Sequence, residues 1–497
     1  MRILLLVHSF NSLSQRLYVE LARDGHELSV EFDIRDDVTL DAVERFRPEL
    51  LLAPFLKRAI PPSVWQGLPC LIVHPGPPGD RGPAALDWAI LRGVEHWGVT
   101  VLQALAALDA GPVWASESFP MRPGAKSSLY RNELTEAAVR AVRRAIARIE
   151  AGERPEPPPA GVHGWQPPLR QAQRAIDWQR DDSATVLRKL RAADGFPGVE
   201  DTLFGQRYRL FDGHPEARLG GAPGALIARR QQAVCRATRD GAVWIGQLQP
   251  VAADGARSFK RPALLSLGER ALQLPESGDD PFAADDASHS LREIRYEERG
   301  AVGYLHFDFY NGAMSTEQCR RLQAAYREAR RRPTRVIVLM GGPDFWSNGM
   351  HLHCIEAAAS PADASWDNIN AIDDLALDII ETGSQLTIAA LQGNAAAGGV
   401  FLALAADEVL ARSGVVLNPH YRNMGNLYGS EYWTYLLPRR VGATAAATLM
   451  ASRLPLGAPE AQALGLIDAH AGGDPAAFRA WVEARAAALA AAPDHAQ

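Results

Sequence analysis

The chain has 497 residues, 47% of them apolar and 22% charged, so it is long enough for two to four globular domains with large cores. Its net charge of −6 provides no basic surface that would attract nucleic acid or an anionic membrane, and we expect neither as a partner. The four cysteines, Cys70, Cys235, Cys319 and Cys354, contain no C-x-x-C pair. This argues against a disulfide framework or a zinc ribbon and favours a cytoplasmic protein.

Two linkers predict the domain organisation. Residues 151–169 are rich in Pro and Gly, and residues 275–290 are acidic, small and aperiodic. They divide the chain into three predicted domains, residues 1–155, 165–275 and 291–497.

The first domain alternates strands and helices. The predicted strands cover 2–8, 27–33, 50–55, 70–74 and 97–104, and a helix covers 12–25. This alternation predicts an α/β fold with a Rossmann-like parallel sheet and helices on both faces. The stretch after 70–74 has the length and pattern of a crossover helix and a return strand.

The other two domains differ in pattern. In the middle domain a helix over 183–194 precedes short strands with turn signals, which predicts a small, OB-like β-barrel. In the last domain a strand over 301–309, a helix over 315–332 and a strand–turn–helix over 387–407 predict a layered α/β fold.

A histidine follows the strand over 70–74. His74 enters the stiff run Pro75-Gly76-Pro77-Pro78-Gly79, and Asp109 lies in a second turn, "LDAGPVW". Ligands of open α/β sheets bind at the carboxyl ends of strands, and a carboxylate beside an imidazole orients it and raises its basicity. The alternative is a structural histidine, which is the commoner case at a strand end.

The same span resembles the folate-dependent formyltransferases. Their motif is roughly N-x-H-x-S-L-L-P, then G-V-T, then L-D-x-G, and this chain has "IVH" (72–74), "GVTV" (98–101) and "LDAG" (108–111). The resemblance implies that His74 and Asp109 are catalytic. Ile72 replaces the asparagine that would stabilise the oxyanion, so either another donor substitutes or the formyl acceptor differs.

The middle domain resembles the C-terminal barrel of methionyl-tRNA formyltransferases. The matching phrases are "AIDW" (175–178), "LRKLRAADGFPGVE" (187–200) and "GAVWIGQLQP" (241–250).

Two glycine-rich turns define a second predicted site, in 341–356 and 391–407. Each leads from a strand into a helix, so backbone N–H groups are available to an oxyanion. Such turns are common in α/β folds, and either alone is weak evidence. His351 and His353 lie in the first turn without a third ligand, and we expect no metal site.

Together these turns resemble the crotonase (enoyl-CoA hydratase/isomerase) superfamily, whose motifs are F-x-x-G-x-D-L and N-G-x-x-x-G-G-G. The resemblance implies that Met350 and Gly398 donate to an oxyanion. The two acids of a hydratase fall at Phe401 and His420, so we do not expect water addition to a double bond.

Tyr421 and Glu431 are the catalytic candidates in the stretch that follows. Aromatic neighbours should desolvate Glu431 in part and raise its pKa toward the range of a general base. Those neighbours are Tyr428, Tyr432 and Trp433. The alternative is that Glu431 pairs with Arg439 or Arg440 on a helix surface.

The whole order of segments resembles the hydrogenase maturation factors that fuse a formyltransferase-like unit to a crotonase-like unit. Phrases such as "HPGPPGDRGPAALDWAI" (74–90) and "NPHYRNMGNLYGSEYWTY" (418–435) carry this resemblance. In that family Tyr421 and Glu431 match the active-site pair. The resemblance implies transfer of formyl from N10-formyltetrahydrofolate to coenzyme A, then decarbonylation of formyl-CoA to CO for the iron of [NiFe]-hydrogenase. Implied protein partners are other maturation proteins or the hydrogenase large subunit.

The predicted cofactor contacts are Ser9 and Asn11 beside the folate, Ile72 in the same pocket, and Arg131 on a phosphate of coenzyme A. An ordinary surface arginine is the alternative for Arg131. Two other functions remain open: a formyltransferase with an amine acceptor, and a non-catalytic CoA-binding or docking module in the C-terminal half.

Overall fold

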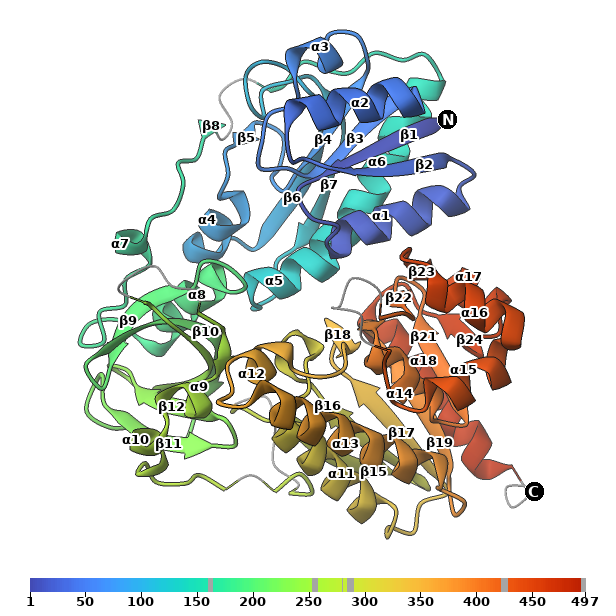
Figure 1. The fold of residues 1–497 in the computed structure, drawn as a ribbon. Coiled ribbons are helices and arrows are strands. Elements are labelled where there is room, and N and C mark those ends of the chain that lie inside the picture. The colour runs from blue at the N-terminus through green and yellow to red at the C-terminus, as the bar shows by residue number, and fades with distance from the viewer. Residues whose placement is uncertain (160–163, 253–257, 279, 284–289, 422–427, 493–497) are drawn as a thin grey trace. The chain divides into compact units, whose positions relative to one another are not determined.

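The computed structural model describes residues 1–159, 164–252, 258–278, 280–283, 290–421 and 428–492 (Figure 1). The chain forms two compact units, Met1–Gly213 and His214–Gln497. The division falls inside one strand, β10 (Gln206–Glu216). Parts of both predicted linkers lie outside the described residues.

A six-stranded sheet organises the first unit, in the order β2-β1-β3-β4-β6-β7. Its strands are β1 (Arg2–Val7), β2 (Glu27–Phe32), β3 (Leu50–Phe55), β4 (Cys70–His74), β6 (His96–Gln103) and β7 (Val113–Pro120). The first four are parallel, as predicted, whereas β6 and β7 are antiparallel to their neighbours. The strand predicted to follow the crossover helix is therefore wrong in direction, because β6 is antiparallel to β4 and not parallel to it. The short strands β5 (Asp80–Arg81) and β8 (Gly164–Trp165) pair separately.

Helices cover both faces of this sheet. They are α1 (Ser12–Arg23), α2 (Asp36–Phe46), α3 (Pro62–Trp65), α4 (Ala85–Arg92), α5 (Lys126–Leu129), the π-helix η1 (Tyr130–Leu134) and α6 (Thr135–Glu150). Two further helices, α7 (Gln171–Arg174) and α8 (Ser183–Ala193), contact β9 (Val199–Leu203) instead. Because successive side chains of a strand point to opposite faces, Ile3 and Leu5 of β1 enter one core and Leu4 and Leu6 the other. The first unit ends in the hairpin of β9 with β10.

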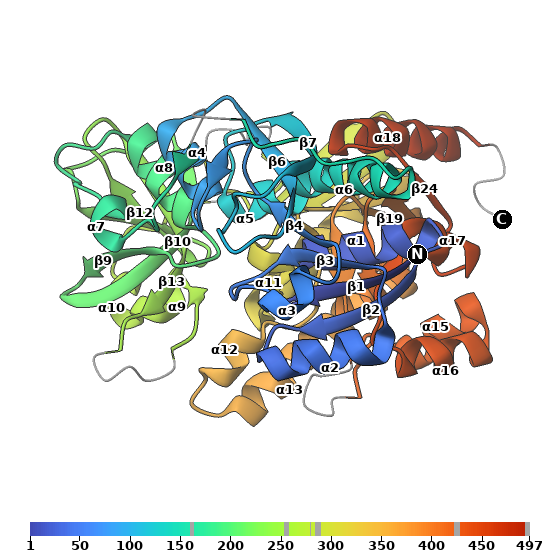
Figure 2. The ribbon, with the colours of Figure 1, turned by 90° about the horizontal axis from the view of Figure 1, so that it is seen from above.

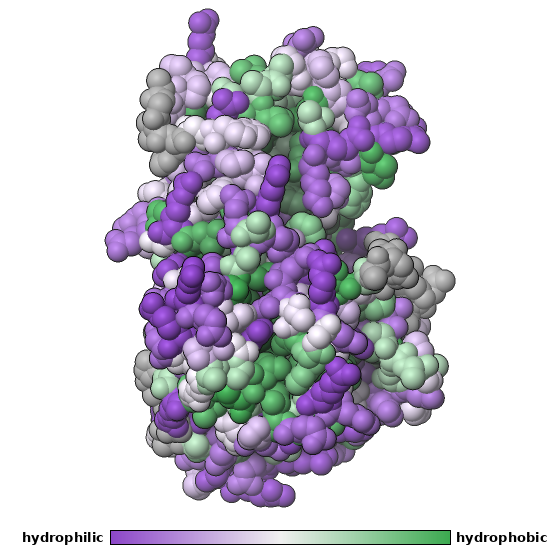
Figure 3. Space-filling view, turned by 90° about the vertical axis from the view of Figure 1, so that its left-hand side faces the viewer, coloured by the Kyte–Doolittle hydropathy of each residue, from purple (hydrophilic) through white to green (hydrophobic). Residues whose placement is uncertain are grey.

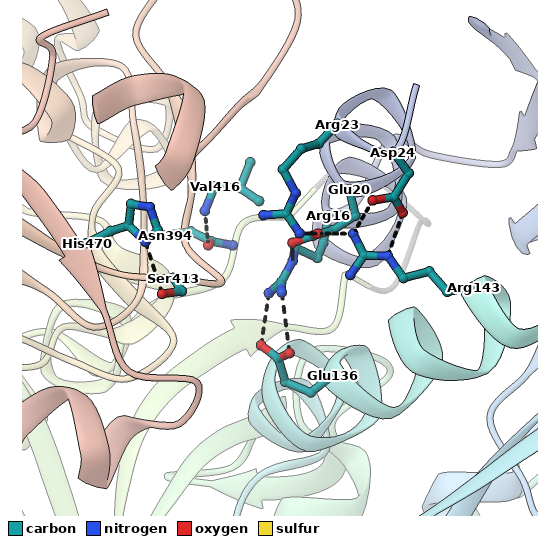
Figure 4. A network of polar contacts seen from close by, with 10 residues as sticks. All are labelled: Arg16, Glu20, Arg23, Asp24, Glu136, Arg143, Asn394, Ser413, Val416 and His470. Carbon is teal, nitrogen blue, oxygen red and sulfur yellow. Dashed lines mark hydrogen bonds and ion pairs between the residues drawn. The ribbon is translucent and has the colours of Figure 1, made fainter. Parts of the chain in front are cut away.

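A partly buried ion-pair network joins α1 to α6, which lie side by side (Figures 1 and 2). The guanidinium of Arg16 contacts Glu20 at 2.8 Å and Glu136 at 2.9 Å (Figure 4). Arg143 of α6 also contacts Glu20, at 2.7 Å. Glu20 is almost fully buried, so these cations compensate a charge that water cannot reach.

The second unit begins with antiparallel strands of the predicted barrel. These are β11 (Leu226–Arg230), β12 (Ala233–Ala237), β13 (Ala242–Pro250) and β14 (Arg261–Pro262), followed by α9 (Ala263–Leu267) and α10 (Glu269–Leu272). Their antiparallel register agrees with the short strands and turn signals of the sequence.

The rest of the second unit contains two more sheets. The first has the order β15-β16-β17-β19-β21-β24 and is parallel apart from the β15–β16 hairpin. Its strands are β15 (Ile294–Arg299), β16 (Val302–Phe307), β17 (Val336–Gly341), β19 (Leu386–Leu391), β21 (Glu408–Arg412) and β24 (Ala469–Ala471). The second sheet consists of β18 (Phe345–Ser347), β20 (Asn394–Ala396), β22 (Val416–Asn418) and β23 (Leu456–Gly457). The side chain of Asn394 accepts the N–H of Val416 at 2.9 Å and so holds β20 against β22 (Figure 4).

Helix α18 (Pro475–Ala491) packs on one face of the larger sheet, and α11 (Thr316–Ala329) and α13 (Pro361–Ile380) pack on the other. The other helical elements of this region are the 3-10 turn η3 (Tyr310–Gly312), α12 (Leu352–Glu356), α14 (Gly398–Leu404), α15 (Trp433–Val441), α16 (Ala443–Ala451) and α17 (Ala458–Ala463). Val336 and Val338 face α18, while Ile337 and Leu339 face α11 and α13. The strand-to-helix passage at 391–398, which the sequence predicts, lies in this packed region.

The exposed surface seen in Figure 3 is mainly hydrophilic, with apolar side chains gathered in patches. Within the described part of the chain, no helix combines the length and the hydropathy needed to cross a bilayer.

We predict that Glu20→Ala lowers the free energy of unfolding by about 1–3 kcal/mol, because it removes the buried anion that Arg16 and Arg143 share, while Glu136 and Asp24 still pair with these two cations. Asp41→Ala is the matched control, since Asp41 forms an exposed pair with Arg45 at the same helical spacing. That change should cost less than about 0.5 kcal/mol. Urea unfolding of both variants measures the difference, and equal losses would contradict a stabilising role of the network.

Candidate functional site

His74 ends strand β4 and lies between two carboxylates. Its Nε2 is 2.9 Å from Oδ2 of Asp80, and its Nδ1 is 3.6 Å from Oδ1 of Asp109. His74 and Asp80 are almost fully buried, whereas the side chain of Asp109 is 19% exposed. The sequence predicts the pairing with Asp109, and the structure places this carboxylate beside the ring at more than hydrogen-bond distance.

The loop after His74 is stiff and tightly anchored. Trp97 donates from Nε1 to the carbonyl of Pro75 at 2.8 Å, and Thr100 donates from Oγ1 to the carbonyl of Gly76 at 2.8 Å. A Cβ on Gly76 would lie 2.4 Å from Oδ2 of Asp80 and 2.7 Å from Nε2 of His74. The loop backbone therefore passes directly over the histidine–carboxylate pair, and only glycine fits there.

Asp109 is held by its own backbone and by one amide. Its φ is +53°, a left-handed conformation that is uncommon for a residue other than glycine. Its Oδ2 accepts the N–H of Gly82 at 3.0 Å, which leaves Oδ1 on the side of His74. The carboxylate can thus face both the ring and a substrate.

The predicted cofactor contacts of this unit lie in three places. Asn11 caps α1, because its Oδ1 accepts the N–H of Ser14 at 3.0 Å, and its Nδ2 donates to the hydroxyl of Tyr130. Ser9 is exposed in the same turn. Ile72 is half-buried within β4, two residues before His74, and supplies no polar group where formyltransferases have asparagine. Arg131 is half-buried in η1, a π-helical turn of the kind often found at functional sites.

The second predicted site is built from two strand ends of the smaller sheet. Met350 follows β18, and Gly398 opens α14 directly after β20. The bridge between Met350 and Met314 uses the carbonyl of Gly349 and the N–H of His351, so the N–H of Met350 points to the opposite side. A Cβ on Gly349 would lie 3.3 Å from the nitrogen of Gly398. The two turns therefore come close together, as the sequence predicts.

Glu431 lies against the start of α14. A Cβ on Gly398 would lie 2.0 Å from Oε1 of Glu431, so the carboxylate touches the glycine that the crotonase resemblance assigns to the oxyanion hole. The hydroxyl of Tyr421 donates to Oε2 of Glu431 at 2.6 Å. The structure thus brings Tyr421, Glu431 and Gly398 into one cluster.

Burial sets the protonation of this cluster. Burial raises the pKa of Glu431 to about 7, while the hydrogen bond from Tyr421 acts in the opposite direction. Burial and the nearby Glu431 also raise the pKa of Tyr421, which stays protonated as a donor. A carboxylate that titrates near neutral pH suits a general base.

Helix α13 holds Glu431 in place through Asp373. The N–H of Glu431 donates to Oδ1 of Asp373 at 2.8 Å. Glu431 and Tyr432 have φ values of +54° and +55°, and two consecutive left-handed residues need such support. Burial raises the pKa of Asp373, and its charge in turn raises the pKa of Glu431.

The structure decides between the two interpretations of Glu431. It is 1% exposed and bonded to Tyr421, whereas Arg440 contacts Asp468 and Arg439 contacts Tyr435. The surface ion pair is therefore wrong, and the desolvated carboxyl is confirmed.

The aromatic contribution differs in part from the prediction. Tyr428 is 73% exposed and Tyr432 36% exposed, whereas Trp433 packs against Phe401 with ring centroids 6.3 Å apart. Phe401, in place of a hydratase acid, stacks on Tyr421 at 5.5 Å between ring centroids and supplies an apolar wall.

His351 has a structural role. Its ring accepts the N–H of Cys354 at 3.3 Å and caps α12, and burial lowers its pKa to about 4. His353 contacts the carbonyl of Lys260 instead. Within the described ranges, no group of three or more His, Cys, Asp or Glu side chains gathers as metal ligands would.

Two residues of these sites were missed by sequence reasoning. Asp80 lies in the quoted Pro-Gly loop, six residues after His74, and a charged side chain in an otherwise apolar stiff loop was a usable signal. Asp373 belongs to a separate helix, and nothing in its local pattern distinguishes it from other helical acids.

Three family models match successive parts of the chain. Residues 26–146 match the formyl transferase family model, residues 168–258 match the formyl transferase C-terminal domain, and residues 297–497 match enoyl-CoA hydratase/isomerase. Methionyl-tRNA formyltransferase of Dechloromonas aromatica is 29% identical over 181 residues, which are 36% of this chain and 58% of that protein.

Two relatives extend over nearly the whole chain. The hydrogenase maturation factor HoxX of Bradyrhizobium diazoefficiens is 57% identical over 493 residues, 98% of this chain and 84% of that protein. The crystal structure of HypX from Aquifex aeolicus in complex with tetrahydrofolic acid is 50% identical, with a TM-score of 0.96 over 100% of this chain and 87% of that chain. The chain therefore belongs to the HoxX/HypX family of hydrogenase maturation factors, which join a formyl transferase unit to an enoyl-CoA hydratase-like unit.

Proposed function

We propose that the chain is a hydrogenase maturation enzyme that catalyses two steps. The first moves the formyl group of N10-formyltetrahydrofolate to the thiol of coenzyme A. The second splits formyl-CoA into CO and coenzyme A, and the CO becomes a ligand of the iron of [NiFe]-hydrogenase. The observation that carries the proposal is the contact of the Glu431 carboxylate with Gly398, in a unit that lacks both hydratase acids.

His74 and Asp109 serve the first step. The ring of His74 takes the thiol proton as the sulfur bonds to the formyl carbon. It returns that proton to N10 of the folate as the carbon–nitrogen bond breaks. Asp109 stabilises the imidazolium that forms in between. Thiols are strong nucleophiles, which favours them as acceptors at a site where Ile72 replaces the oxyanion donor.

Glu431 and Tyr421 serve the second step. The amides of Met350 and Gly398 bind the thioester oxygen, and Glu431 removes the formyl hydrogen as a proton. The electron pair of that C–H bond completes CO as the carbon–sulfur bond breaks. Tyr421 gives the leaving sulfur a proton and recovers one from Glu431, so the site returns to its starting state. No external oxidant or reductant is needed.

The family relatives support both substrates. Tetrahydrofolic acid is bound to HypX of Aquifex aeolicus, which favours a folate beside Ser9, Asn11 and Ile72. The enoyl-CoA hydratase/isomerase match favours an acyl-CoA thioester at the second site. The half-buried Arg131 is the proposed phosphate contact. We propose other maturation proteins or the hydrogenase large subunit as the recipients of CO.

The proposal is tested by supplying both substrates together and then omitting one of them. Protein, N10-formyltetrahydrofolate and coenzyme A should release CO, detected spectroscopically by deoxyhaemoglobin, and omission of coenzyme A should abolish it. We predict that His74→Ala abolishes formyl-CoA formation yet still splits added formyl-CoA. Glu431→Gln should do the reverse, with CO release about 10²–10⁴ times slower.

Glu356→Gln is the matched control, because Glu356 is exposed on α12 of the same unit, and it should behave as wild type. A formylated amine without CO would support an amine formyltransferase instead. Binding of coenzyme A without turnover of formyl-CoA would support a docking module. Full CO release by Glu431→Gln would exclude this carboxylate as the base.

The pH dependence of the second step follows from the pKa of Glu431, which is raised to about 7. A base must be ionised, so the rate of CO release from added formyl-CoA should rise with pH, reach half its maximum near pH 7 and level off above it. Asp373→Asn removes a negative charge near Glu431 while keeping an oxygen for its N–H, and should move this midpoint to lower pH. Rates measured between pH 5 and 9 check both statements, and a rate that falls through pH 7 would contradict them.

Glu431 should also destabilise the fold at alkaline pH. Its carboxyl ionises near 4.5 in the unfolded chain but only near 7 when folded, so stability falls as pH rises between these values. We predict that Glu431→Gln, which cannot ionise, unfolds with a free energy higher than wild type by on the order of 3 kcal/mol at pH 8. At pH 5 the gain should be much smaller. Urea unfolding at both pH values, with Glu356→Gln as control, measures the difference.

A further inference from the structure

The carboxylate of Asp80 has one hydrogen-bond partner among the described residues, the ring of His74. Its side chain is completely buried, and its Oδ2 is 2.9 Å from Nε2 of His74. Its Oδ1 is also buried and has no hydrogen-bond partner among the described residues. His74 is thus the group that compensates the charge of Asp80.

Other buried aspartates of the same unit are held differently. Asp194 accepts from the hydroxyl of Ser127 and from the N–H of Asp212, one bond to each oxygen. Asp87 contacts two cations, Lys126 and Arg174. Carboxylates that stabilise a fold satisfy their oxygens in this way, because an unpaired buried oxygen is costly. Asp80 retains that cost, which points to a role in chemistry rather than in folding.

We propose that Asp80 is the positioning residue of the first site and that it keeps the proton of His74 on Nε2. An ionised carboxylate can only accept a hydrogen bond, so the nitrogen beside it must carry the proton. The lone pair of the ring then lies on Nδ1, toward the partly exposed side chain of Asp109. The reaction assigned to that lone pair, removal of the acceptor's proton, rests on the proposed function.

The geometry gives Asp80 and Asp109 different roles toward His74. Asp80 lies at hydrogen-bond distance, buried beneath the Gly76 backbone, where no substrate can come between it and the ring. Asp109 lies 3.6 Å away on the side that solvent reaches, a distance that leaves Nδ1 without a strong hydrogen bond to it. The reacting nitrogen is therefore Nδ1.

The ¹⁵N signals of the ring test this assignment without any substrate. In protein labelled at histidine, His74 is identified as the signal missing from His74→Gln. At pH 8 the wild-type ring should show a protonated Nε2 and an unprotonated Nδ1. Asp80→Asn, whose amide can donate to Nε2, should move the proton to Nδ1, and Asp80→Ala should leave the ring exchanging between both forms.

Kinetics supply the second readout. Asp80→Asn should lower kcat of formyl transfer by about 10²–10⁴ with little change in the KM of the formyl donor, because the wrong nitrogen then carries the lone pair. Asp87→Asn is the control for loss of a buried carboxylate. It should lower the melting temperature but leave both kcat and the ring signals of His74 as in wild type.

The outcomes separate this inference from the proposed function. A wild-type ring that carries a proton on Nδ1 overturns it, and so does a ring that keeps its proton on Nε2 alone in both Asp80 variants. If wild type makes no formyl-CoA, the proposed function fails, while the ring signals still decide the role of Asp80.

Discussion

Burial of a carboxylate is costly unless a neighbouring group stabilises its charge or the carboxylate takes up a proton, and both candidate sites depend on this constraint. The charge of Asp80 is stabilised by an imidazole at hydrogen-bond distance, and this contact fixes the ring of His74. Glu431 has no cation in its described surroundings and a hydroxyl donor in Tyr421, so burial raises its pKa to about 7 instead. One physical constraint therefore yields an oriented imidazole in the first unit and a carboxylate poised for proton transfer in the second.

Glycine makes room for both carboxylates. A Cβ on Gly76 would meet the Asp80–His74 pair, and a Cβ on Gly398 would meet Glu431 at 2.0 Å. In each case the backbone itself forms the wall beside the carboxylate, because a side chain at that position would clash with it. Glu431 adds a left-handed conformation of its own, held from α13 by Asp373. These conformations are costly, and their presence around one side chain is typical of a functional site.

The sequence predicts the elements that carry the sites better than the contacts that complete them. Strand β4 and the strand-to-helix passage into Gly398 follow from hydrophobic pattern and from glycine, and both lie where predicted. The direction of β6 could not be foreseen, because a strand reads the same whichever way it pairs. Asp80 and Asp373 were missed because their meaning comes from three-dimensional neighbours. The desolvation of Glu431 was foreseen with three aromatic neighbours, of which Tyr428 and Tyr432 are exposed, whereas Trp433 packs against Phe401, the ring that stacks on Tyr421.

The replaced residues of the second unit fit together chemically. A hydratase needs acids to manage water at a carbon–carbon double bond, and formyl-CoA, with no α-carbon, offers them no task. Phe401 occupies one of those positions and stacks on Tyr421, which bonds Glu431. The presence of Phe401 in place of a hydratase acid therefore does more than remove hydratase activity. It places an apolar ring against Tyr421, the hydrogen-bond partner of Glu431, and burial raises the pKa of that carboxylate to about 7, the range that the proposed decarbonylation requires.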